Sequence, residues 1–445
     1  MTAIKRFIKD YKNKKVLIMG FGLQGRGVQD AIFFAEIGAK VLVTDLKTKK
    51  ELIPSINQLK NLDVKMVLGQ HRKKDILSAD LILRNAAVPW NYPYLNLARK
   101  RKIAIEMDES LFARYAEVKI IGITGTRGKS TTTTLIFNIL KNAGLSVYLG
   151  GNILGIATLP LLKKIKKNDI LIAELSSWQL QGFGQNKISP YMAVMTNIYQ
   201  DHLNHYSSMK SYIEDKKTIF KYQTKKDFLF LNYDDERLRK LAKQAKSQVV
   251  YYNKSDFPKN LKLKIRGDHN KLNIVAALKV IEVLKVNKQV ALKTIADFKG
   301  LPFRLETIAN IKGVEYINDS TSTTPAAGIA ALTSFSKPVL LIAGGSSKNL
   351  NMSLFAKMIA QKVKSVVFLK GEETNNLSNL VKKYGGKEKI IGTFPSIKDA
   401  VLEIKTLAKT GDAVLLSPGC ASFGMFKNEF DRGKKFNQLI SSFKK

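Results

Sequence analysis

The chain has 445 residues, with 74 lysines and arginines against 36 aspartates and glutamates, for a formal net charge of +38. A chain of this length exceeds what one hydrophobic core usually supports, which predicts roughly two to four domains. Its single cysteine, Cys420, excludes an internal disulfide, and no apolar run approaches the ~20 residues that span a bilayer. The first residues lack the apolar segment of a signal peptide, so we expect a cytosolic protein that does not bind a membrane.

The positive charge raises the question of nucleic-acid binding, because a basic surface attracts the phosphate backbone. The basic residues are 61 lysines and 13 arginines, and they are spread in twos and threes along the whole chain. Phosphate-gripping sites usually depend on arginine, whose planar group forms paired hydrogen bonds. The composition therefore favours a lysine-rich surface that attracts small anionic substrates, and we expect no nucleic-acid partner.

The region 1–107 begins with an apolar strand and a glycine-rich turn. Strands are predicted at 15–20, 40–45 and 81–89. Gly20, Gly22 and Gly25 fit the spacing G-x-G-x-x-G, and Asp45 follows twenty residues after the last of them, where a Rossmann carboxylate contacts a ribose. Taken alone, this pattern fits either a dinucleotide site or a plain strand-turn-helix.

The region 108–300 contains the segment GITGTRGKSTTT at 122–133, directly after the apolar run VKII. Gly122, Gly125 and Gly128 allow backbone N–H groups to surround phosphate oxygens at the start of a helix. Lys129 supplies a charge for the β- and γ-phosphates and Ser130 a hydroxyl for Mg²⁺. The usual pattern has glycine where this chain has Ile123, but a plain turn has no need of Gly-Lys-Ser in that order, so the segment predicts a nucleotide site.

Polar residues follow further predicted strands of this region, at 170–177, 191–198 and 227–235. Glu174 ends the first of these strands, where a carboxylate beside a phosphate loop is suited to Mg²⁺. Asp201, His202 and His205 follow the second, either as a metal-binding group or as loop residues. Asn270 and Asn273 are three residues apart on one face of a predicted helix, and they suit amide contacts with a base or form part of a helix cap.

The region 301–445 has predicted strands at 314–319, 338–345, 365–371 and 413–419. Arg304 lies at its start, and polar loops follow three of the strands, which place Asp319, Ser346-Ser347-Lys348 and the segment CASFGMFKNEFDRG at strand ends. Such loops are either catalytic or exposed to solvent. Together, the alternating strands and helices predict an α/β fold with three domains: a Rossmann-like N-terminal domain at 1–107, a central P-loop ATPase-type domain with a mainly parallel sheet at 108–300, and a Rossmann-like C-terminal domain at 301–445.

The ordered set GITGTRGKSTTT, GGNI, ELSSWQL, TNIYQDHL, HNKLN, FRLE, NDSTSTTP, AGGSSK and SPGCASFGMFKNEFDRG resembles the Mur ligase family over nearly the whole chain. The last of these segments resembles the members of the family that add D-glutamate. The resemblance implies an ATP-dependent amide ligase of peptidoglycan precursor synthesis, which joins D-glutamate to UDP-N-acetylmuramoyl-L-alanine through an acyl phosphate. The N-terminal domain would then bind the UDP-linked substrate, the central domain ATP, and the C-terminal domain the amino acid.

The resemblance also implies roles for individual residues. Lys129, His202 and Lys216 would be catalytic, and Ser130, Glu174, His202 and Lys216 would bind or lie beside Mg²⁺, with Lys216 carbamylated. ATP would contact Gly125, Thr126, Gly128, Lys129, Ser130, Thr131, Asn270, Asn273, Arg304 and Asp319. The UDP-linked substrate would contact Leu23, Gln24, Asp45 and Asn152, and D-glutamate would contact Thr323, Lys348, Ser422 and Phe423. We expect the enzyme to act as a monomer.

The chain departs from the family pattern at three places. Thr321 replaces a lysine in a segment that commonly reads DSKATN, Asn85-Ala86-Ala87 replaces Ser-Pro-Gly, and Glu429 replaces an aromatic residue. These departures keep one alternative open: a Mur-type or folylpolyglutamate-type ligase with another amino acid or acceptor. The net charge of +38 keeps open a second and less favoured alternative, an NTPase that binds nucleic acid.

Overall fold

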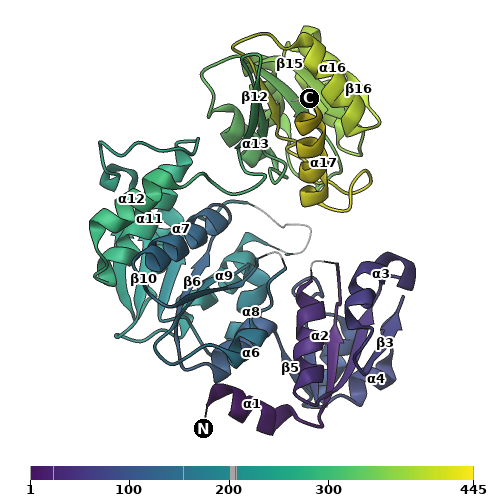
Figure 1. Ribbon diagram of the computed structural model, residues 1–445, viewed down its shortest axis with the longest axis vertical. Helices are drawn as coiled ribbons and strands as arrows, with labels where there is room; N and C mark the ends of the chain where they lie inside the picture. The colour runs from purple at the N-terminus through teal and green to yellow at the C-terminus, as the bar shows by residue number, and fades with distance from the viewer. Residues whose placement is uncertain (1, 24, 154, 201–205, 207, 444–445) are drawn as a thin grey trace. The chain divides into compact units, whose positions relative to one another are not determined.

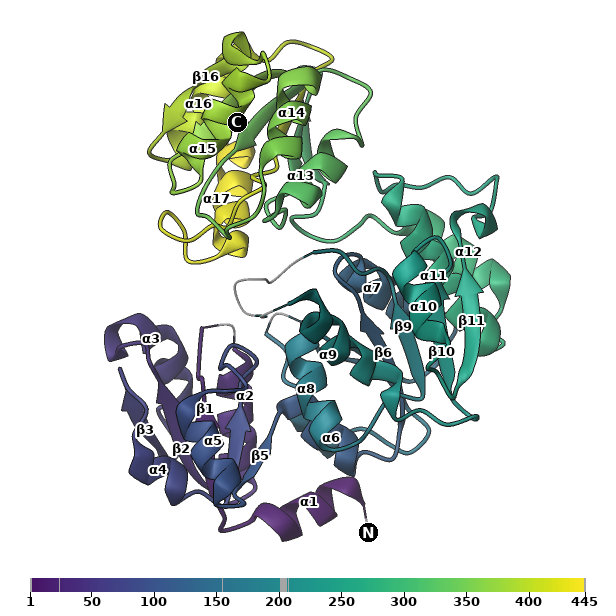
Figure 2. The same ribbon diagram turned by 180° about the vertical axis from the view of Figure 1, so that it is seen from behind.

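The computed structural model describes residues 2–23, 25–153, 155–200, 206 and 208–443 (Figures 1 and 2). The chain forms two compact units, one made of residues 1–260 and 272–295 and the other of residues 261–271 and 296–445. The division between them passes through helix α11 (His269–Val283). The predicted domain boundaries at 107/108 and 300/301 stay predictions.

The first unit begins with a parallel sheet of strand order β3-β2-β1-β4-β5, which is the order of a Rossmann-like fold. Its strands are β1 (Lys15–Met19), β2 (Lys40–Asp45), β3 (Val64–Leu68), β4 (Leu81–Arg84) and β5 (Ala104–Glu106). The helices of this part are α1 (Ala3–Tyr11), α2 (Arg26–Glu36), α3 (Lys49–Ile56), the 3₁₀ turn η1 (Asn57–Leu59), α4 (Lys73–Leu77), α5 (Pro93–Lys100) and α6 (Asp108–Tyr115). Helix α2 packs on one face of the sheet, and α4 and α5 pack on the other.

The second sheet of this unit is also parallel, with strand order β11-β10-β9-β6-β8-β7. Its strands are β6 (Lys119–Thr124), β7 (Val147–Gly151), β8 (Ile170–Glu174), β9 (Met192–Met195), β10 (Phe228–Asn232) and β11 (Gln248–Tyr252). The accompanying helices are α7 (Lys129–Asn142), η2 (Leu159–Lys163), α8 (Ser177–Gln185), α9 (Met209–Lys221), α10 (Glu236–Ala242), η3 (Lys254–Asp256), α11 and α12 (Lys288–Asp297). Strand β6 is central, so the predicted phosphate loop lies at the carboxyl edge of the sheet between β8 and β9.

The second unit is built on a sheet of order β12-β13-β17-β14-β15-β16, in which only the edge strand β12 is antiparallel among the described strands. The strands are β12 (Glu306–Ile311), β13 (Val314–Asn318), β14 (Val339–Ala343), β15 (Val363–Leu369), β16 (Ile390–Phe394) and β17 (Ala413–Leu416). The helices are α13 (Pro325–Leu332), α14 (Ser353–Lys362), α15 (Thr374–Lys383), η4 (Lys387–Lys389), α16 (Ile397–Leu407) and α17 (Glu429–Ser442). Helices α13, α14 and α15 pack on one face of the sheet, and α16 and α17 on the other.

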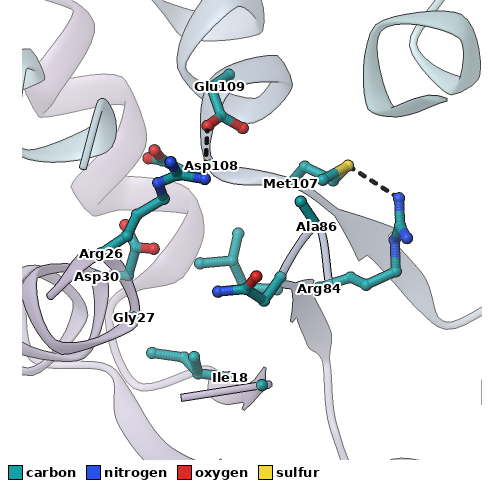
Figure 3. Close-up of a pocket in the computed structure, with 12 residues that line it drawn as sticks. Ile18, Arg26, Gly27, Asp30, Arg84, Ala86, Met107, Asp108 and Glu109 are labelled. Atoms are coloured by element: carbon teal, nitrogen blue, oxygen red, sulfur yellow. Dashed lines mark hydrogen bonds and ion pairs between the residues drawn. The ribbon is translucent and has the colours of Figure 1, made fainter. Parts of the chain in front are cut away.

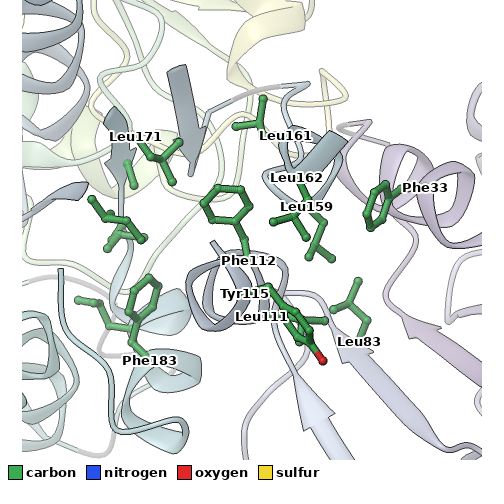
Figure 4. Close-up of a cluster of buried hydrophobic side chains, with 14 of the residues drawn as sticks. Phe33, Leu83, Leu111, Phe112, Tyr115, Leu159, Leu161, Leu162, Leu171 and Phe183 are labelled. Carbon is green, nitrogen blue, oxygen red and sulfur yellow. The ribbon is translucent and has the colours of Figure 1, made fainter. Parts of the chain in front are cut away.

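The two sheets of the first unit share one apolar core, in which helix α6 lies between them (Figure 4). Leu111 and Phe112 of α6 are fully buried, and the same cluster contains Leu83 of β4 and Leu171 of β8. Each such side chain contributes about 1.5–3 kcal/mol when it is fully buried. The apolar contacts therefore hold the strand ends of both sheets in a fixed relation within this unit.

The predicted α/β fold with parallel sheets is confirmed. In the described parts of the chain, no helix is both long enough and apolar enough to cross a membrane.

Candidate active site

The loop between β6 and α7 can be formed only by glycine at two positions. Gly125 and Gly128 have φ values of +147° and +84°, which other residues rarely adopt. A Cβ atom on Gly125 would lie 1.9 Å from Oγ1 of Thr196, and one on Gly128 would lie 2.2 Å from Oδ1 of Asn273. The loop ends at the first turn of α7, where free N–H groups favour an anion.

Two lysines bind the same carbonyl oxygen of this loop. Nζ of Lys129, in the first turn of α7, donates to the carbonyl oxygen of Gly125 at 2.9 Å, and Nζ of Lys216, from α9, donates to it at 3.0 Å. Lys216 is 2% exposed, and its Nζ lies 4.7 Å from the ring centroid of Tyr212. The hydroxyl groups of Tyr212 and Thr126 lie 3.2 Å apart, so α9 also touches the phosphate loop itself. The structure thus brings Lys216 to the loop that carries Gly125, Thr126 and Lys129.

Glu174 ends β8, directly beside β6, and is buried. Its Oε1 accepts a hydrogen bond from Nδ2 of Asn152 at 3.1 Å, which brings the predicted substrate residue to the predicted metal ligand. Ser130 and Thr131 lie in the first turn of α7 and are half-buried. A carboxylate and a hydroxyl beside a phosphate cradle are the hard oxygen donors that Mg²⁺ prefers, so these residues fit that ion.

Of the other candidate residues, Asn273 lies at this loop, Asn270 belongs to the second unit, and four lie outside the described residues. Asn273 of α11 lies against Gly128, and its Oδ1 accepts from the hydroxyl of Thr132 at 3.5 Å. Asn270, in the second unit, donates from Nδ2 to the carbonyl oxygen of Arg266 at 2.6 Å. Gln24, Asp201, His202 and His205 lie outside the described residues.

The glycine-rich turn of the first sheet is bound by Asp45. Its Oδ2 accepts from the N–H group of Gly22 at 2.8 Å, and its Oδ1 accepts from that of Lys47 at 2.9 Å. Leu23 is 40% exposed on the same turn. The turn lies at the carboxyl end of β1, beside the loop after β4, and the strand order reverses between these two strands. Ligands of open α/β sheets bind at such a point.

A buried acidic cluster lines the pocket between the ends of β1 and β4, and the sequence analysis did not identify it (Figure 3). Asp30, Asp108 and Glu109 are at most 4% exposed, and Nη1 of Arg26 lies 3.6 Å from Oε1 of Glu109. Burial raises the pKa of Glu109 to about 7, and burial with the neighbouring carboxylates raises the pKa of Asp30 well above its ordinary value. The only sequence signal is that Asp108 and Glu109 lie shortly after a strand, since β5 ends at Glu106.

In the second unit, Asp319 follows β13 and is buried. Its Oδ2 accepts from the hydroxyl of Ser417 at 2.8 Å, and its Oδ1 accepts from the N–H group of Leu305 at 3.2 Å. Burial raises the pKa of Asp319 to about 7, although these hydrogen bonds and the charge of Arg304 oppose the shift. This carboxyl group is therefore close to its titration point at neutral pH.

Arg304 is exposed and lies between two residues with left-handed backbone, Phe303 (φ 63°) and Leu305 (φ 46°). Such backbone costs about 1–3 kcal/mol per residue and needs support from its surroundings. Thr321 provides part of it, because its hydroxyl donates to the carbonyl oxygen of Phe303 at 2.8 Å. At this departure from the family pattern, threonine thus supports the segment that presents Arg304.

The loops after β13, β14 and β17 meet at one edge of the sheet. Nζ of Lys348 donates to Oγ1 of Thr323 at 3.0 Å, and Ser346 forms a β-bridge with Ala421. Ser422 is 3% exposed, and its Oγ has no hydrogen-bond partner within the described part of the chain. Phe423, beside it, is 65% exposed. This edge therefore presents an ammonium group, an unsatisfied hydroxyl and an exposed aromatic ring.

Comparison with protein families matches the chain in three consecutive parts. Residues 14–106 match the model "Mur ligase MurD-like, N-terminal domain", residues 123–294 match "Mur ligase middle domain", and residues 303–420 match "Mur ligase, glutamate ligase domain".

Among curated proteins, the chain is similar to UDP-N-acetylmuramoylalanine--D-glutamate ligase of Roseiflexus sp. (strain RS-1), with 36% identity over 97% of this chain and 99% of that protein. It is 33% identical to the ligase of the same name from Clostridioides difficile (strain 630), over 98% of this chain and 100% of that protein. Among solved structures, the UDP-N-acetylmuramate-alanine ligase MurC of Thermotoga maritima has a TM-score of 0.63 at 17% identity and covers 96% of this chain and 99% of its own. MurF ligase of the same organism, solved with ADP, has a TM-score of 0.60 at 19% identity, over 98% of this chain and 96% of that one. These structural likenesses concern the fold.

Proposed function

The chain belongs to the Mur ligase family, and we propose that it joins D-glutamate to UDP-N-acetylmuramoyl-L-alanine at the cost of ATP, as a step of peptidoglycan precursor synthesis. The observation that carries this proposal is the full-length similarity, at 31–36% identity, to ligases named for that reaction. Family members are ATP-dependent ligases, and the formation of ADP follows from the two-step chemistry that we propose.

In the first step, a carboxylate oxygen of the alanine residue attacks the γ-phosphorus of ATP, and the bond from that phosphorus to the β–γ bridging oxygen breaks. ADP leaves and an acyl phosphate remains. In the second step, the amine of D-glutamate attacks the acyl carbon, the carbon–oxygen bond to phosphate breaks, and the amine loses a proton as the amide forms. Phosphoryl transfer of this kind depends on positioning and charge neutralisation more than on covalent help from the protein.

The phosphate loop meets these two needs. The backbone of Gly125, Thr126 and Gly128 surrounds the phosphates, and the ammonium group of Lys129 neutralises the charge that develops on the transferred group. Ser130 and Glu174 would hold Mg²⁺, and His202 would bind or lie close to a second cation; such ions supply further neutralisation of the phosphate oxygens when bound. Thr131, Asn270, Asn273, Arg304 and Asp319 would complete the ATP site.

Lys216 is proposed to be carbamylated. An amine reacts with CO₂ only in its neutral form, with formation of a carbon–nitrogen bond and loss of a proton. Burial and the nearby ammonium group of Lys129 both disfavour a second positive charge at this position. The carbamate would replace that charge with a negative one beside the proposed metal site.

The acceptor is assigned to residues of the first unit and the amino acid to residues of the second. Leu23, Gln24, Asp45 and Asn152 would contact the UDP-linked substrate. Thr323, Lys348, Ser422 and Phe423 would contact D-glutamate, whose carboxylates suit an ammonium group and a hydroxyl. The buried Oγ of Ser422 supports this assignment, because a buried polar group without a partner costs about 1–3 kcal/mol unless a ligand satisfies it. We further propose that the enzyme acts as a monomer in the cytoplasm, where ATP and nucleotide-linked sugars are available.

The proposal is tested by measuring ADP release in the presence of UDP-N-acetylmuramoyl-L-alanine and each of D-glutamate, L-glutamate, D-aspartate, L-alanine and meso-diaminopimelate. We expect turnover with D-glutamate and none when either substrate is omitted. Preference for another amino acid would reassign the enzyme within the family, and ADP release without an acceptor would contradict ligase activity.

One variant tests the proposed D-glutamate site independently of the ATP site. Ser422→Ala should raise KM for D-glutamate about tenfold or more, because a hydrogen bond to a charged group is lost, and should leave KM for ATP and the thermal stability unchanged. Ser442→Ala, whose hydroxyl donates to Leu439 on α17, is the control and should behave as the parent enzyme.

A further inference from the structure

We propose that Arg84 is a positioning residue, which holds the loop 85–88 at the crevice of the first sheet in a fixed relation to helices α8 and α9 of the second sheet. The link runs from Arg84 through Gln181 to Asp215, the residue before Lys216. This inference rests on the proposed function, because it concerns the binding of the UDP-linked substrate at that crevice.

Arg84 ends β4 and is 2% exposed. It takes part in none of the ion pairs of the described residues, although the charges of Asp215 and Glu109 act on it from a greater distance. Its Nη1 donates to the carbonyl oxygen of Val88 at 2.6 Å. Its Nη2 donates to two groups on α8, Oε1 of Gln181 at 2.9 Å and the carbonyl oxygen of Trp178 at 3.3 Å. Nη2 also approaches Sδ of Met107 at 3.0 Å, the contact drawn in Figure 3. The guanidinium group also lies 5.2 Å from the ring centroid of Trp90. Burial lowers its pKa to about 10, so the group stays charged at neutral pH. A buried charge without an ion-pair partner is costly, and packing alone would be served as well by an apolar side chain.

The hydrogen bond to Val88 closes the loop after β4. The N–H group of Val88 donates to the carbonyl oxygen of Asn85 at 3.0 Å, and that of Ala87 donates to Oδ1 of Asn85 at 3.1 Å. The loop packs on the glycine-rich turn, since a Cβ atom on Gly20 would lie 2.9 Å from the Cβ of Asn85. Arg84 therefore fixes the shape of one wall of the crevice at which an open α/β sheet binds its ligand.

Gln181 connects this wall to α9 in one orientation only. Its Oε1 accepts from Arg84, which has no acceptor, and its Nε2 donates to Oδ2 of Asp215 at 2.7 Å. If the amide were flipped, its NH₂ group would face the N–H donors of Arg84 and its oxygen would face the carboxylate of Asp215, and neither contact would be a hydrogen bond. The same Oδ2 of Asp215 accepts from the hydroxyl of Tyr206 at 2.9 Å, and the rings of Tyr206 and Tyr212 lie 5.2 Å apart.

The consequence is a continuous set of contacts from the crevice wall to the phosphate loop. Tyr212 reaches Thr126 through its hydroxyl group, and Lys216 follows Asp215 on the same helix. Because the acceptor carboxylate must lie in line with the γ-phosphate, an error in the position of the wall relative to this loop misaligns the two reactants. Arg84 and Gln181 act through this relation and touch neither reactant.

The test compares Arg84→Met, Gln181→Leu and the double variant with Arg99→Met. Arg99 stacks on the same ring of Trp90, at 4.0 Å, but within the described chain it donates hydrogen bonds to Trp90 and Asn96, which both belong to the region of the first sheet. The variant Arg99→Met therefore removes an arginine from this neighbourhood without cutting the link. We expect Arg84→Met and Gln181→Leu each to raise KM for UDP-N-acetylmuramoyl-L-alanine and its calorimetric Kd about tenfold or more, with KM for ATP within about twofold of the parent value. The double variant should be no worse than the poorer single variant, since both cut one link. Arg99→Met should match the parent.

Four outcomes decide the matter. Unchanged Kd in Gln181→Leu, or additive effects in the double variant, would overturn the positioning role even if Arg84→Met fails to fold. A lower Tm with unchanged Kd would show that Arg84 is structural only. Failure of the parent protein to bind this substrate would refute the proposed function instead.

Discussion

At the scale of single residues, the carbonyl oxygen of Gly125 is the point at which the proposed chemistry can be tested most directly. It accepts from Lys129 and Lys216, whose side chains come from the helices that follow β6 and β9. Only Lys216 is proposed to be modified, and its neighbour on the helix, Lys217, forms an ion pair with Glu214 at 2.9 Å. Lys216 and Lys217 therefore make a matched pair of positions for substitution.

Lys216→Ala is expected to lower kcat by about 10²–10³-fold, the usual cost of removing one preorganised charged group. Formate or acetate should restore part of the activity, since a small carboxylate can take the place of the carbamate. Turnover of UDP-N-acetylmuramoyl-L-alanine with and without added carboxylate is the measurement.

Lys217→Ala is the control and should retain activity near that of the parent, because its partner is on the helix surface. Carboxylate rescue at Lys217 rather than Lys216 would shift the assigned register by one residue.

Site residues could be predicted from the sequence where they lie together in one short segment with a recognisable pattern. Gly125, Gly128 and Lys129 belong to one short segment, and the structure gives them the loop conformation that the segment predicts. Asp30 and Arg84 could not be selected in this way. Each is an ordinary charged residue among many in the sequence, and only the packing of α2, α6 and α8 makes it buried.

At the scale of elements, helices α2 and α6 meet at the acidic cluster. Asp30 comes from α2, and Asp108 and Glu109 from the first turn of α6. Oδ1 of Asp30 has no hydrogen-bond partner within the described chain, whereas both oxygens of Asp108 accept from the N–H groups of Thr158 and Leu159, at 2.7 and 2.6 Å. Asp30 is therefore the member of the cluster that gains most from a proton.

The pKa values of Asp30 and Glu109 are raised in the folded protein, for Glu109 from 4.5 to about 7, so the folded state keeps protons that the unfolded chain releases. This stabilisation is complete below the unfolded pKa values and is lost as the pH rises toward and through about 7. Asp30→Asn carries a permanent donor in place of the proton. We expect the fall in Tm between pH 5.5 and 8.5 to be smaller in this variant than in the parent, by about 2–4 °C for each kcal/mol recovered. Thermal unfolding monitored by circular dichroism gives the comparison.

Asp63→Asn removes an exposed carboxylate and is the control for this measurement. Its pH dependence should parallel that of the parent. A parallel curve for Asp30→Asn as well would mean that Asp30 is ionised in the folded protein.

The strands that the sequence predicts and those that it misses differ in one physical property. The predicted strands are the inner strands of the described sheets, and they are almost completely buried, as in β4, β8 and β14. The edge strands of the described sheets are only partly buried: β3, β5, β7, β11, β12 and β16. Inner strands of a parallel sheet are covered on both faces, which requires apolar residues throughout, while an edge strand escapes that requirement.

At the scale of the whole molecule, the charge of +38 acts on substrates that are all anions. A field of this sign increases the rate at which anions reach the protein, and added salt screens it. We expect kcat/KM for UDP-N-acetylmuramoyl-L-alanine to fall several-fold between 50 and 400 mM KCl, with kcat nearly constant.

Stopped-flow or initial-rate measurements at a series of ionic strengths give this dependence, with sucrose in place of salt to control for viscosity and osmolarity. A flat profile would show that the lysines do not assist substrate capture. Tight, salt-sensitive DNA binding that stimulates ATP hydrolysis would favour the nucleic-acid alternative instead.

The path of the chain between the two units affects how the protein is made. Residues 261–271 belong to the second unit, but residues 272–295 belong to the first. During synthesis, the first unit cannot be complete until residue 295 has left the ribosome. By that time the segment 261–271, with Arg266 that pairs with Glu315, has already emerged and waits for partners that are not yet translated. The first unit therefore cannot finish folding until about two-thirds of the chain has been synthesised.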